Sequence, residues 1–324
     1  MVGLQAQDAP GARLGIRSRT KGLTVADVER ERIEDRSFVR AWAMRYTIHL
    51  VPSEDFPWIR DLVSPPHVAA SHKRMAQEGL SPEDAERGRR VIRKMLEGGP
   101  VTRAEMREAV ARKGLARGAG RQAWVHLLGL MTYEGEMVTG PYVGKQETMV
   151  LLRDWLPGKP PKPPKDPPAE LARRYLLGHG PATIDDFRWW SSLRAADARA
   201  GFAAIGDELV EESPGLWRHR SQRKGAAETR TVHLLPSFDH YYLGYRDRSH
   251  VVTSEGAARM SRGGFFFNFV AVNGGAVGLW KLTRTKGGYE VTIEPFARLP
   301  SRSAIEHEVA DIRRFLEAEV LLSY

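Results

Sequence analysis

The sequence predicts an α+β protein in which short helical units are repeated along the chain and a β-rich domain follows them. Two observations predict this fold class. Three stretches, which begin at Gly22, Gly99 and Gly180, share a turn residue, then a threonine, then a carboxylate three positions after the threonine. After about residue 228 the pattern changes to strand-like segments joined by glycine-rich turns.

The three repeated stretches predict helix N-termini. A threonine at the N-cap accepts a hydrogen bond from the backbone, and a carboxylate at the third helical position favours the positive end of the helix dipole. We expect the second pair to form the fullest capping box. The predicted pairs are Thr24 with Asp27, Thr102 with Glu105, and Thr183 with Asp186.

The elements around the third stretch predict a compact unit. Helices are expected over residues 169–178, 186–191 and 195–205, followed by strands at 208–212 and 216–219 on either side of a Ser-Pro-Gly turn. The second stretch repeats this order, with helices at 87–96, 103–112 and 121–132 and strands at 136–139 and 147–151. Three helices followed by a β-hairpin are the order of a winged helix, which is a helix-turn-helix with a β wing.

The first stretch is the least regular copy. It predicts a helix at 24–33 and a long strand at 39–51. Within that strand the alternation places Arg45, Thr47 and His49 on one side and apolar residues on the other. We therefore predict an α+β fold of tandem winged-helix units with a C-terminal antiparallel β-rich domain.

Five segments are predicted along the chain. Winged-helix units are expected over residues 1–80, 81–155 and 169–227, with a lysine-bearing polyproline linker at 156–168 that should be extended. The β-rich domain covers 228–324. Its expected elements are strands at 232–236, 265–272, 276–283 and 289–296 and a closing helix at 304–321.

Composition limits the classes of function. A net charge of +9, carried largely by arginine, favours a polyanionic partner. The chain has no cysteine, which excludes disulfides and thiolate chemistry and fits a reducing cytoplasm. We expect no membrane segment, because no apolar run is long enough to cross a bilayer. The scattered histidines and the lack of a glycine-rich phosphate loop predict no metal and no cofactor.

One acidic and basic cluster could carry chemistry in the β-rich domain. Asp239 and Asp247 would form a carboxylate pair for acid–base work, or a network of ion pairs and turns with Arg246 and Arg248. The ion-pair interpretation is the simpler one, and we favour it.

Two adjacent tryptophans, Trp189 and Trp190, form a second candidate feature. Neighbouring residues cannot share one face of a helix. We expect one ring in the core and the other between units, with base stacking as the alternative for the more exposed ring.

Four blocks of the sequence occur in a fixed order: Gly3-Leu-Gln-Ala-Gln-Asp, residues 39–51, residues 180–191 and residues 235–248. As a set they resemble the AlkZ/YcaQ family of winged-helix DNA glycosylases. The resemblance implies tandem winged-helix units around a concave basic surface that binds duplex DNA. It also implies removal of bulky N7-alkylated purines, including those in interstrand crosslinks, in base excision repair by a monomer.

The same resemblance implies the functional residues. Gln5-Ala6-Gln7 matches the Gln-x-Gln branch of the family, so Gln5 and Gln7 are expected to be catalytic. Alkylation at N7 makes the purine a cationic leaving group, so two amides that orient the attacking water can suffice. No Schiff-base lysine is implied, and no lyase activity is expected. The side chains expected at the DNA surface are Arg40, Arg45, His49, Arg89, Arg90, Arg246 and Arg248.

A second interpretation is a non-catalytic winged-helix DNA binder, such as a regulator or a lesion-recognition protein. As the resemblance has it, family members carry a helix-length segment before the Gln-x-Gln motif, whereas four residues precede Gln5 here. Chain termini fray unless they are tied down, which would leave the two glutamines unsupported. Against a regulator, three units in one chain can bind DNA as a monomer, and the sequence has no zipper for dimerisation.

Overall fold

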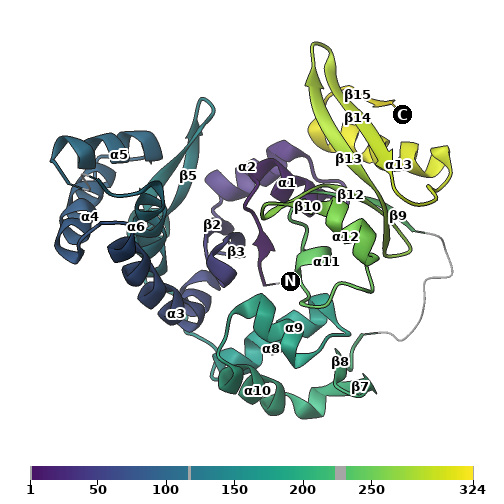
Figure 1. The fold of residues 1–324 in the computed structure, drawn as a ribbon, viewed down its shortest axis with the longest axis horizontal. Coiled ribbons are helices and arrows are strands. Elements are labelled where there is room, and N and C mark those ends of the chain that lie inside the picture. Colours follow the sequence, from purple (N-terminus) through teal and green to yellow (C-terminus); the bar gives the residue numbers. More distant parts are fainter. Residues whose placement is uncertain (1, 116–117, 223–230, 324) are drawn as a thin grey trace.

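The computed structural model describes residues 2–115, 118–222 and 231–323. Three groups of elements surround a small N-terminal sheet at the centre of the molecule (Figure 1). One group, with α4 to α6 and β5, lies to the left of the sheet; a second, with α8 to α10, lies below it; and the C-terminal β-rich domain lies at the upper right. The α+β fold class predicted from the sequence is confirmed.

The N-terminal sheet contains β1 (Leu4–Gln5), β2 (Phe38–Trp42) and β3 (Ile48–Pro52) in the order β1-β3-β2, with all pairs antiparallel. Helices α1 (Ala9–Arg17) and α2 (Val25–Ile33) connect β1 to β2. The prediction of one long strand over 39–51 is wrong. The short 3₁₀ turn η1 (Met44–Tyr46) divides it, because Arg45 and Tyr46 adopt positive φ angles of 55° and 56° that extended strands exclude.

The N-terminal segment packs against three hydrophobic cores. Val2 packs into the core that the sheet shares with α8 to α10, whereas Leu4 and Ala6 pack into the core of the α4 to α6 group. Leu14 of α1 packs into the core of the C-terminal domain. The expected fraying of the segment that carries the two glutamines is therefore wrong for residues 2–6, all of which are buried.

The second group has the predicted winged-helix order. Helices α4 (Pro82–Leu96), α5 (Arg103–Arg112) and α6 (Arg121–Tyr133) precede the wing strands β5 (Met137–Val143) and β6 (Gln146–Leu151). The short strand β4 (Val101–Thr102) pairs with β6, and α7 (Leu152–Trp155) ends the group. The long helix α3 (Phe56–Gln77) follows β3 and packs along α6.

The third group repeats the order with α8 (Pro167–His179), α9 (Ile184–Ser191) and α10 (Ala195–Ala204), the turn η2 (Gly206–Glu208), and a shorter wing of β7 (Leu209–Ser213) and β8 (Leu216–His219). Residues 156–166, between α7 and α8, form no helix or strand. All three predicted threonine–carboxylate pairs form complete capping boxes, which confirms the predicted helix starts of α2, α5 and α9. The predicted limits of the five segments stay a prediction.

The C-terminal domain is a five-stranded sheet in the order β15-β14-β13-β12-β9. Its strands are β9 (Val232–Leu235), β12 (Phe269–Val272), β13 (Gly275–Thr285), β14 (Gly288–Pro295) and β15 (Val320–Ser323). Helices α11 (His240–Leu243) and α12 (Ser254–Met260) and the small hairpin of β10 (Ser261–Arg262) and β11 (Phe265–Phe266) lie between β9 and β12.

The closing helix is shorter than predicted. Helix α13 (Arg302–Leu316) ends where Glu317 adopts a positive φ of 50°, which reverses the chain direction. The remaining residues form β15, which pairs in parallel with β14, so the prediction of a helix to residue 321 and of purely antiparallel pairing is wrong.

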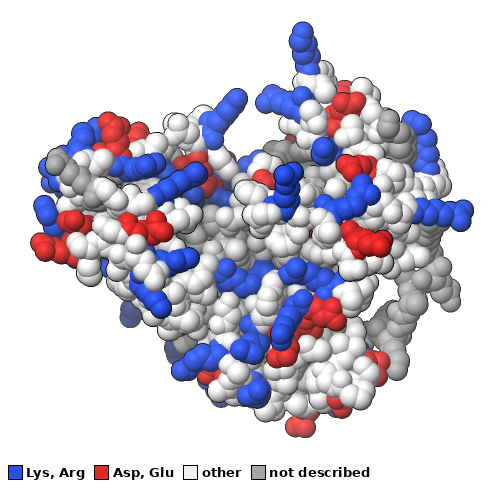
Figure 2. Space-filling model, in the orientation of Figure 1, with Lys and Arg blue, Asp and Glu red and all other residues white. Residues whose placement is uncertain are grey.

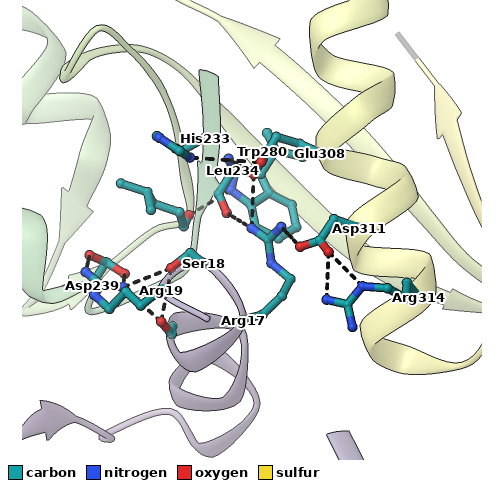
Figure 3. Close-up of polar contacts among 12 residues, drawn as sticks. Arg17, Ser18, Arg19, His233, Leu234, Asp239, Trp280, Glu308, Asp311 and Arg314 are labelled. Carbon is teal, nitrogen blue, oxygen red and sulfur yellow. Dashed lines mark hydrogen bonds and ion pairs between the residues drawn. The ribbon is translucent and has the colours of Figure 1, made fainter. Parts of the chain in front are cut away.

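A buried arginine joins α1 to the C-terminal domain (Figure 3). The guanidinium of Arg17 is 1% exposed and donates to Asp311 (2.9 Å) and Glu308 (3.1 Å) of α13 and to the carbonyl of Leu234 (2.9 Å). Next to it, Arg19 makes two hydrogen bonds to the carboxylate of Asp239, at 2.7 and 2.9 Å. These contacts fix α1, and with it the short strand that carries Gln5.

Candidate active site

The two glutamines predicted to be catalytic lie at the end of β1. Gln5 is 5% exposed and pairs with His49 of β3 in the strand register, whereas Gln7 is exposed. The Oε1 atom of Gln5 accepts a hydrogen bond from the guanidinium of Arg45. The Oε1 atom of Gln7 accepts one from the backbone N–H of Ile48, at 3.2 Å. The structure therefore brings Gln5, Gln7 and Arg45 together around the start of β3.

The orientation of both amides follows from the chemistry of their partners. A guanidinium and a backbone N–H can only donate, so the atom that each one contacts must be the amide oxygen. Within the described residues, neither glutamine NH₂ group has a hydrogen-bond partner. Each oxygen keeps a second lone pair. Each amide can therefore accept one more hydrogen bond and donate two.

Arg45 is held at the junction of three parts of the chain. Its Cζ atom lies 4.4 Å from the centre of the Trp189 ring of α9, and its backbone N–H donates to the Ser192 hydroxyl at 3.0 Å. Burial, and next the positive charge of Arg248, lower the pKa of Arg45 to about 9. The group is still protonated at neutral pH, because its pKa stays well above 7.

Arg248 approaches the same tryptophan. Its Cζ atom lies 4.7 Å from the centre of the Trp189 ring and 4.9 Å from that of Tyr242. Burial also lowers the pKa of Arg248. Among the described residues, neither Arg45 nor Arg248 forms an ion pair with a carboxylate, so this arginine pair is a partly desolvated positive charge without a counter-charge.

His49 lies in the interior, not on an exposed strand face. It is fully buried, and its Nδ1 atom lies 3.0 Å from the carbonyl oxygen of Thr47. Burial, together with the charge of Arg45, lowers the pKa of His49 to about 3, so the ring is neutral near pH 7. The predicted strand face of Arg45, Thr47 and His49 is wrong, because η1 removes Arg45 from the strand.

Two more buried histidines pack behind His49. The ring centres of His49 and His240 are 5.7 Å apart, and those of His240 and His179 are 5.6 Å apart. Burial lowers the pKa of both His179, to about 4, and His240. This group, the histidine cluster of His49, His179 and His240, is uncharged near pH 7, and His49 pairs with Gln5 in the strand register.

The other four predicted DNA-contacting residues have structural or surface contacts. Arg40 is buried, donates to the carbonyl of Ala6 at 2.8 and 3.0 Å and pairs with Glu147, so it holds the backbone between the two glutamines. Arg89 is engaged by Glu134 and Glu136. The remaining two, Arg90 and Arg246, lie on the surface, and each makes an exposed ion pair.

The aspartates of the β-rich domain have structural contacts. Asp239 is bound by Arg19, and Asp247 accepts from the backbone N–H of Ser249 at 2.9 Å. An ion-pair and turn network is therefore present, but its arginine is Arg19, which the sequence did not indicate. For the two tryptophans the main prediction is confirmed: Trp190 is fully buried, and Trp189 connects α9 to Arg45 and Arg248.

Charge is distributed over a hollowed face of the molecule. Figure 2 shows lysine and arginine side chains along the rims of the hollow between the second group and the C-terminal domain, and across the central face. Acidic side chains lie among them, at the left edge and on the lower and right parts of the face. Such a surface suits the phosphates of a nucleic acid.

The described residues contain no cluster of histidines and carboxylates that could hold a metal ion. Among the helices of the described residues, none is long and apolar enough to cross a membrane. A cavity of about 470 Å³ lies beside the polyproline linker, and none of the predicted site residues lines it.

Tandem winged-helix groups beside a hollow that carries lysine and arginine side chains define a DNA-binding class of protein. The sequence profile described as DNA glycosylase AlkZ-like matches residues 1–315, and the chain belongs to this family. It is 30% identical to an interstrand DNA cross-link repair glycosylase of Streptomyces sahachiroi in an alignment that covers 97% of this chain and 88% of the relative.

A solved structure gives the same result for the fold. The structure of Streptomyces sahachiroi DNA glycosylase AlkZ superposes with a TM-score of 0.78 and 24% identity, covering 99% of this chain and 91% of the other. At this identity the likeness shows the fold. The family and the curated relative show a DNA glycosylase, a hydrolase of N-glycosyl bonds that acts in DNA repair, and they do not favour the non-catalytic interpretation.

Proposed function

We propose that this glycosylase hydrolyses the N-glycosidic bond of N7-alkylated purines in duplex DNA, including bulky adducts and interstrand crosslinks, and that it acts as a monomer. The curated relative is named for repair of interstrand crosslinks, which supports the substrate class. We also propose that the chain belongs to the Gln-x-Gln branch, with Gln5 and Gln7 as its catalytic pair.

The proposed hydrolysis needs no strong general acid and no strong general base. Alkylation at N7 places a positive charge on the purine, which then leaves without protonation. The developing oxocarbenium ion must meet a water molecule on its free face, and orientation of that water lowers the barrier. The second lone pair of each glutamine oxygen accepts a hydrogen bond from the attacking water, which loses its proton to solvent after the bond to the sugar forms, and an NH₂ group can donate to a neighbouring sugar or phosphate oxygen.

The observation that carries the proposal is the fixed orientation of the two amides. Arg45 and the backbone of Ile48 hold the two oxygens, and β3 holds β1 by strand pairing. Groups that are fixed before the substrate binds contribute more to catalysis than groups that must be ordered during the reaction. An exposed accidental Gln-x-Gln pair would not have both oxygens anchored.

Arg45 and Arg248 are proposed to bind a backbone phosphate next to the lesion. Their positive charge has no carboxylate partner among the described residues, and a phosphate would supply the missing counter-charge. Such a phosphate would also prevent the arginines from opposing the positive charge that develops on the sugar. Contact of His49 with a phosphate is not part of this proposal, since its ring is buried.

The packing of α6 favours an enzyme over a reader of base sequence. In a helix-turn-helix, the last helix enters the major groove. Here α3 covers α6, and every residue of α6 from Leu127 to Tyr133 is buried. The second group can therefore bind the DNA backbone through its wing and surface arginines, but its third helix cannot read bases along that length.

The test is base release from duplex DNA carrying N7-methylguanine, followed by detection of abasic sites under single-turnover conditions. We expect Gln5→Ala and Gln7→Ala each to lower the rate about a hundredfold, comparable to removal of one positioned polar group from an enzyme site. Gln77→Ala is the matched control, because Gln77 also accepts from an arginine but is exposed on α3. Equal rates for all four proteins would exclude the proposed roles.

A further inference from the structure

A second cavity lies on the other side of η1 from the two glutamines. It measures about 390 Å³ and opens between the end of β2, α3 and α6, which lie side by side in Figure 1. This volume is within the range of about 300–1,000 Å³ that is usual for sites of small organic molecules. The residues that give the cavity its character are Trp42, Tyr46, Arg74, Val125, His126 and Tyr133.

The walls of this cavity are mainly aromatic. The ring of Tyr46 meets those of Tyr133 and His126 edge to face, at 5.8 and 6.1 Å between ring centres. Tyr133 is 3% exposed, and its hydroxyl has no hydrogen-bond partner among the described residues. A buried hydroxyl without a partner is costly in a folded protein, and a ligand atom in the cavity would satisfy it.

The cavity is connected to the active site by the backbone of η1. Arg45 and Tyr46 are consecutive, so their Cα atoms are about 3.8 Å apart. Arg45 contacts Gln5 and Trp189, whereas Tyr46 lines the cavity. Two residues later, the N–H of Ile48 holds Gln7. The cavity and the two glutamines therefore border the same short turn, on opposite sides of its backbone.

The charged side chains near the cavity indicate which kind of ligand fits it. Arg74 lines it, and the guanidinium of Arg103 lies 5.0 Å from the centre of the Trp42 ring. An N7-alkylated purine is itself a cation, and no carboxylate is among the residues that line this cavity to attract it. Recognition of an extruded base also relies on paired donors and acceptors along the base edge. A neutral, planar group that stacks on rings fits this lining better.

We propose that this cavity binds the planar aromatic part of a bulky N7 adduct, while the purine and its sugar stay at the two glutamines. The inference rests on the proposed function and adds a specificity site to it. Gly129 of α6 provides the space. A Cβ atom at this position would lie 3.8 Å from Tyr133 and 3.9 Å from Trp42, which is ordinary contact, so a leucine is accommodated only by filling the cavity.

The experiment compares two duplexes, one with the N7-guanine adduct of aflatoxin epoxide and one with N7-methylguanine. We expect Gly129→Leu to lower kcat/KM for the aflatoxin adduct at least tenfold more than for N7-methylguanine, mainly through KM. Ala76→Leu is the control, because it adds the same side chain at an exposed position of α3 outside the cavity. Circular dichroism and thermal unfolding establish that each variant is folded.

The outcomes separate the two proposals. Equal loss on both duplexes in a folded Gly129→Leu protein would overturn the cavity proposal and leave the proposed function intact. No base release from either duplex by the wild-type protein would overturn the proposed function itself. If Gly129→Leu does not fold, Val125→Trp at the exposed mouth of the cavity makes the same comparison, since Val125 is 41% exposed.

Discussion

Two arginines in this protein, the buried Arg17 and the half-buried Arg45, have opposite surroundings. Arg17 donates to two carboxylates and a carbonyl at the junction of α1 with α13. Arg45 is half-buried, donates to a neutral amide and lies against a tryptophan, and the charge that lowers its pKa is that of another arginine, Arg248. The first charge is compensated within the fold, and the second is not.

This difference separates a structural arginine from a functional one. A buried charge is expensive unless a counter-charge accompanies it. The Arg17 site meets that requirement in the free protein, so its task is complete once the chain has folded. The Arg45 site does not, and it becomes compensated only when an anion binds. We therefore expect substitutions at Arg17 to alter stability and substitutions at Arg45 to alter activity.

The largest effect is expected for Arg17→Met. Loss of one partner of a buried ion pair costs about 3–5 kcal/mol, and we expect the lower end, about 3 kcal/mol, because Asp311 stays partly exposed to water. Urea unfolding measures this change. The control is Arg112→Met, whose ion pair with Glu108 is exposed and should contribute less than about 1 kcal/mol. An unfolding free energy equal to that of the wild type would contradict a structural role for Arg17.

The next effect depends on pH and concerns the histidine cluster beside Arg45. The pKa of His49 in the folded protein, about 3, is below its usual value of about 6.5, so the folded state favours the neutral ring. The stability that follows is fully present above pH 6.5 and is lost as the pH falls toward 3. His49 alone should lower the free energy of unfolding by about 1.6 kcal/mol between pH 6.5 and pH 5.

Denaturant unfolding at a series of pH values measures that loss. His49→Leu should flatten the dependence, because the unfolded chain then takes up one proton fewer. His72→Leu, at an exposed position of α3, is the control and should leave the curve close to that of the wild type. A wild-type free energy of unfolding that stays constant from pH 7 to pH 5 would show that His49 is not buried as a neutral ring.

The sequence predicted the helix starts and the two glutamines of this site better than the contacts between its side chains. The capping threonines identified the starts of α2, α5 and α9, because that motif acts within four consecutive residues. The resemblance indicated Gln5 and Gln7. Neither could show that Arg45 leaves the strand, since the positive φ angles of η1 depend on how β2 and β3 pair. The alternation pattern of residues 39–51 looked continuous, because both strands bury apolar side chains.

Tertiary contacts account for the other differences. Arg17 and Arg19 lie in a short basic stretch that looks like exposed surface, and their partners are more than two hundred residues away in the sequence. Trp189 and Arg248 meet Arg45 only because three groups of elements converge on the N-terminal sheet. Local periodicity carries no information about such long-range pairs.

A smaller effect is expected for Arg45→Met, and it should appear in base release. Loss of the hydrogen bond to Gln5 and of the proposed phosphate contact should slow release from N7-methylguanine about tenfold, equivalent to about 1.4 kcal/mol. The free energy of unfolding should change by less than about 1 kcal/mol, because the substitution removes an uncompensated charge. Single-turnover kinetics and urea unfolding test the two parts. If the Arg45→Met protein lost much of its stability but released the base at the wild-type rate, the role of Arg45 would be structural, like that of Arg17.

The smallest effect concerns the salt dependence of binding to undamaged duplex DNA. Each phosphate that a cationic side chain neutralises releases condensed counterions, and this contributes about 0.9 to the slope of log affinity against log salt concentration. If Arg45 and Arg248 share one phosphate, Arg248→Met should reduce the slope by about one unit or less.

Arg17→Met, assayed at a temperature where it is folded, is the control and should leave the slope unchanged, because the charge of Arg17 is already neutralised within the protein. Fluorescence anisotropy at several salt concentrations measures both slopes. Identical slopes for wild type and Arg248→Met would mean that the uncompensated arginine pair binds no phosphate. The difference between the Arg17 site and the Arg45 site would then depend only on the hydrogen bond between Arg45 and Gln5.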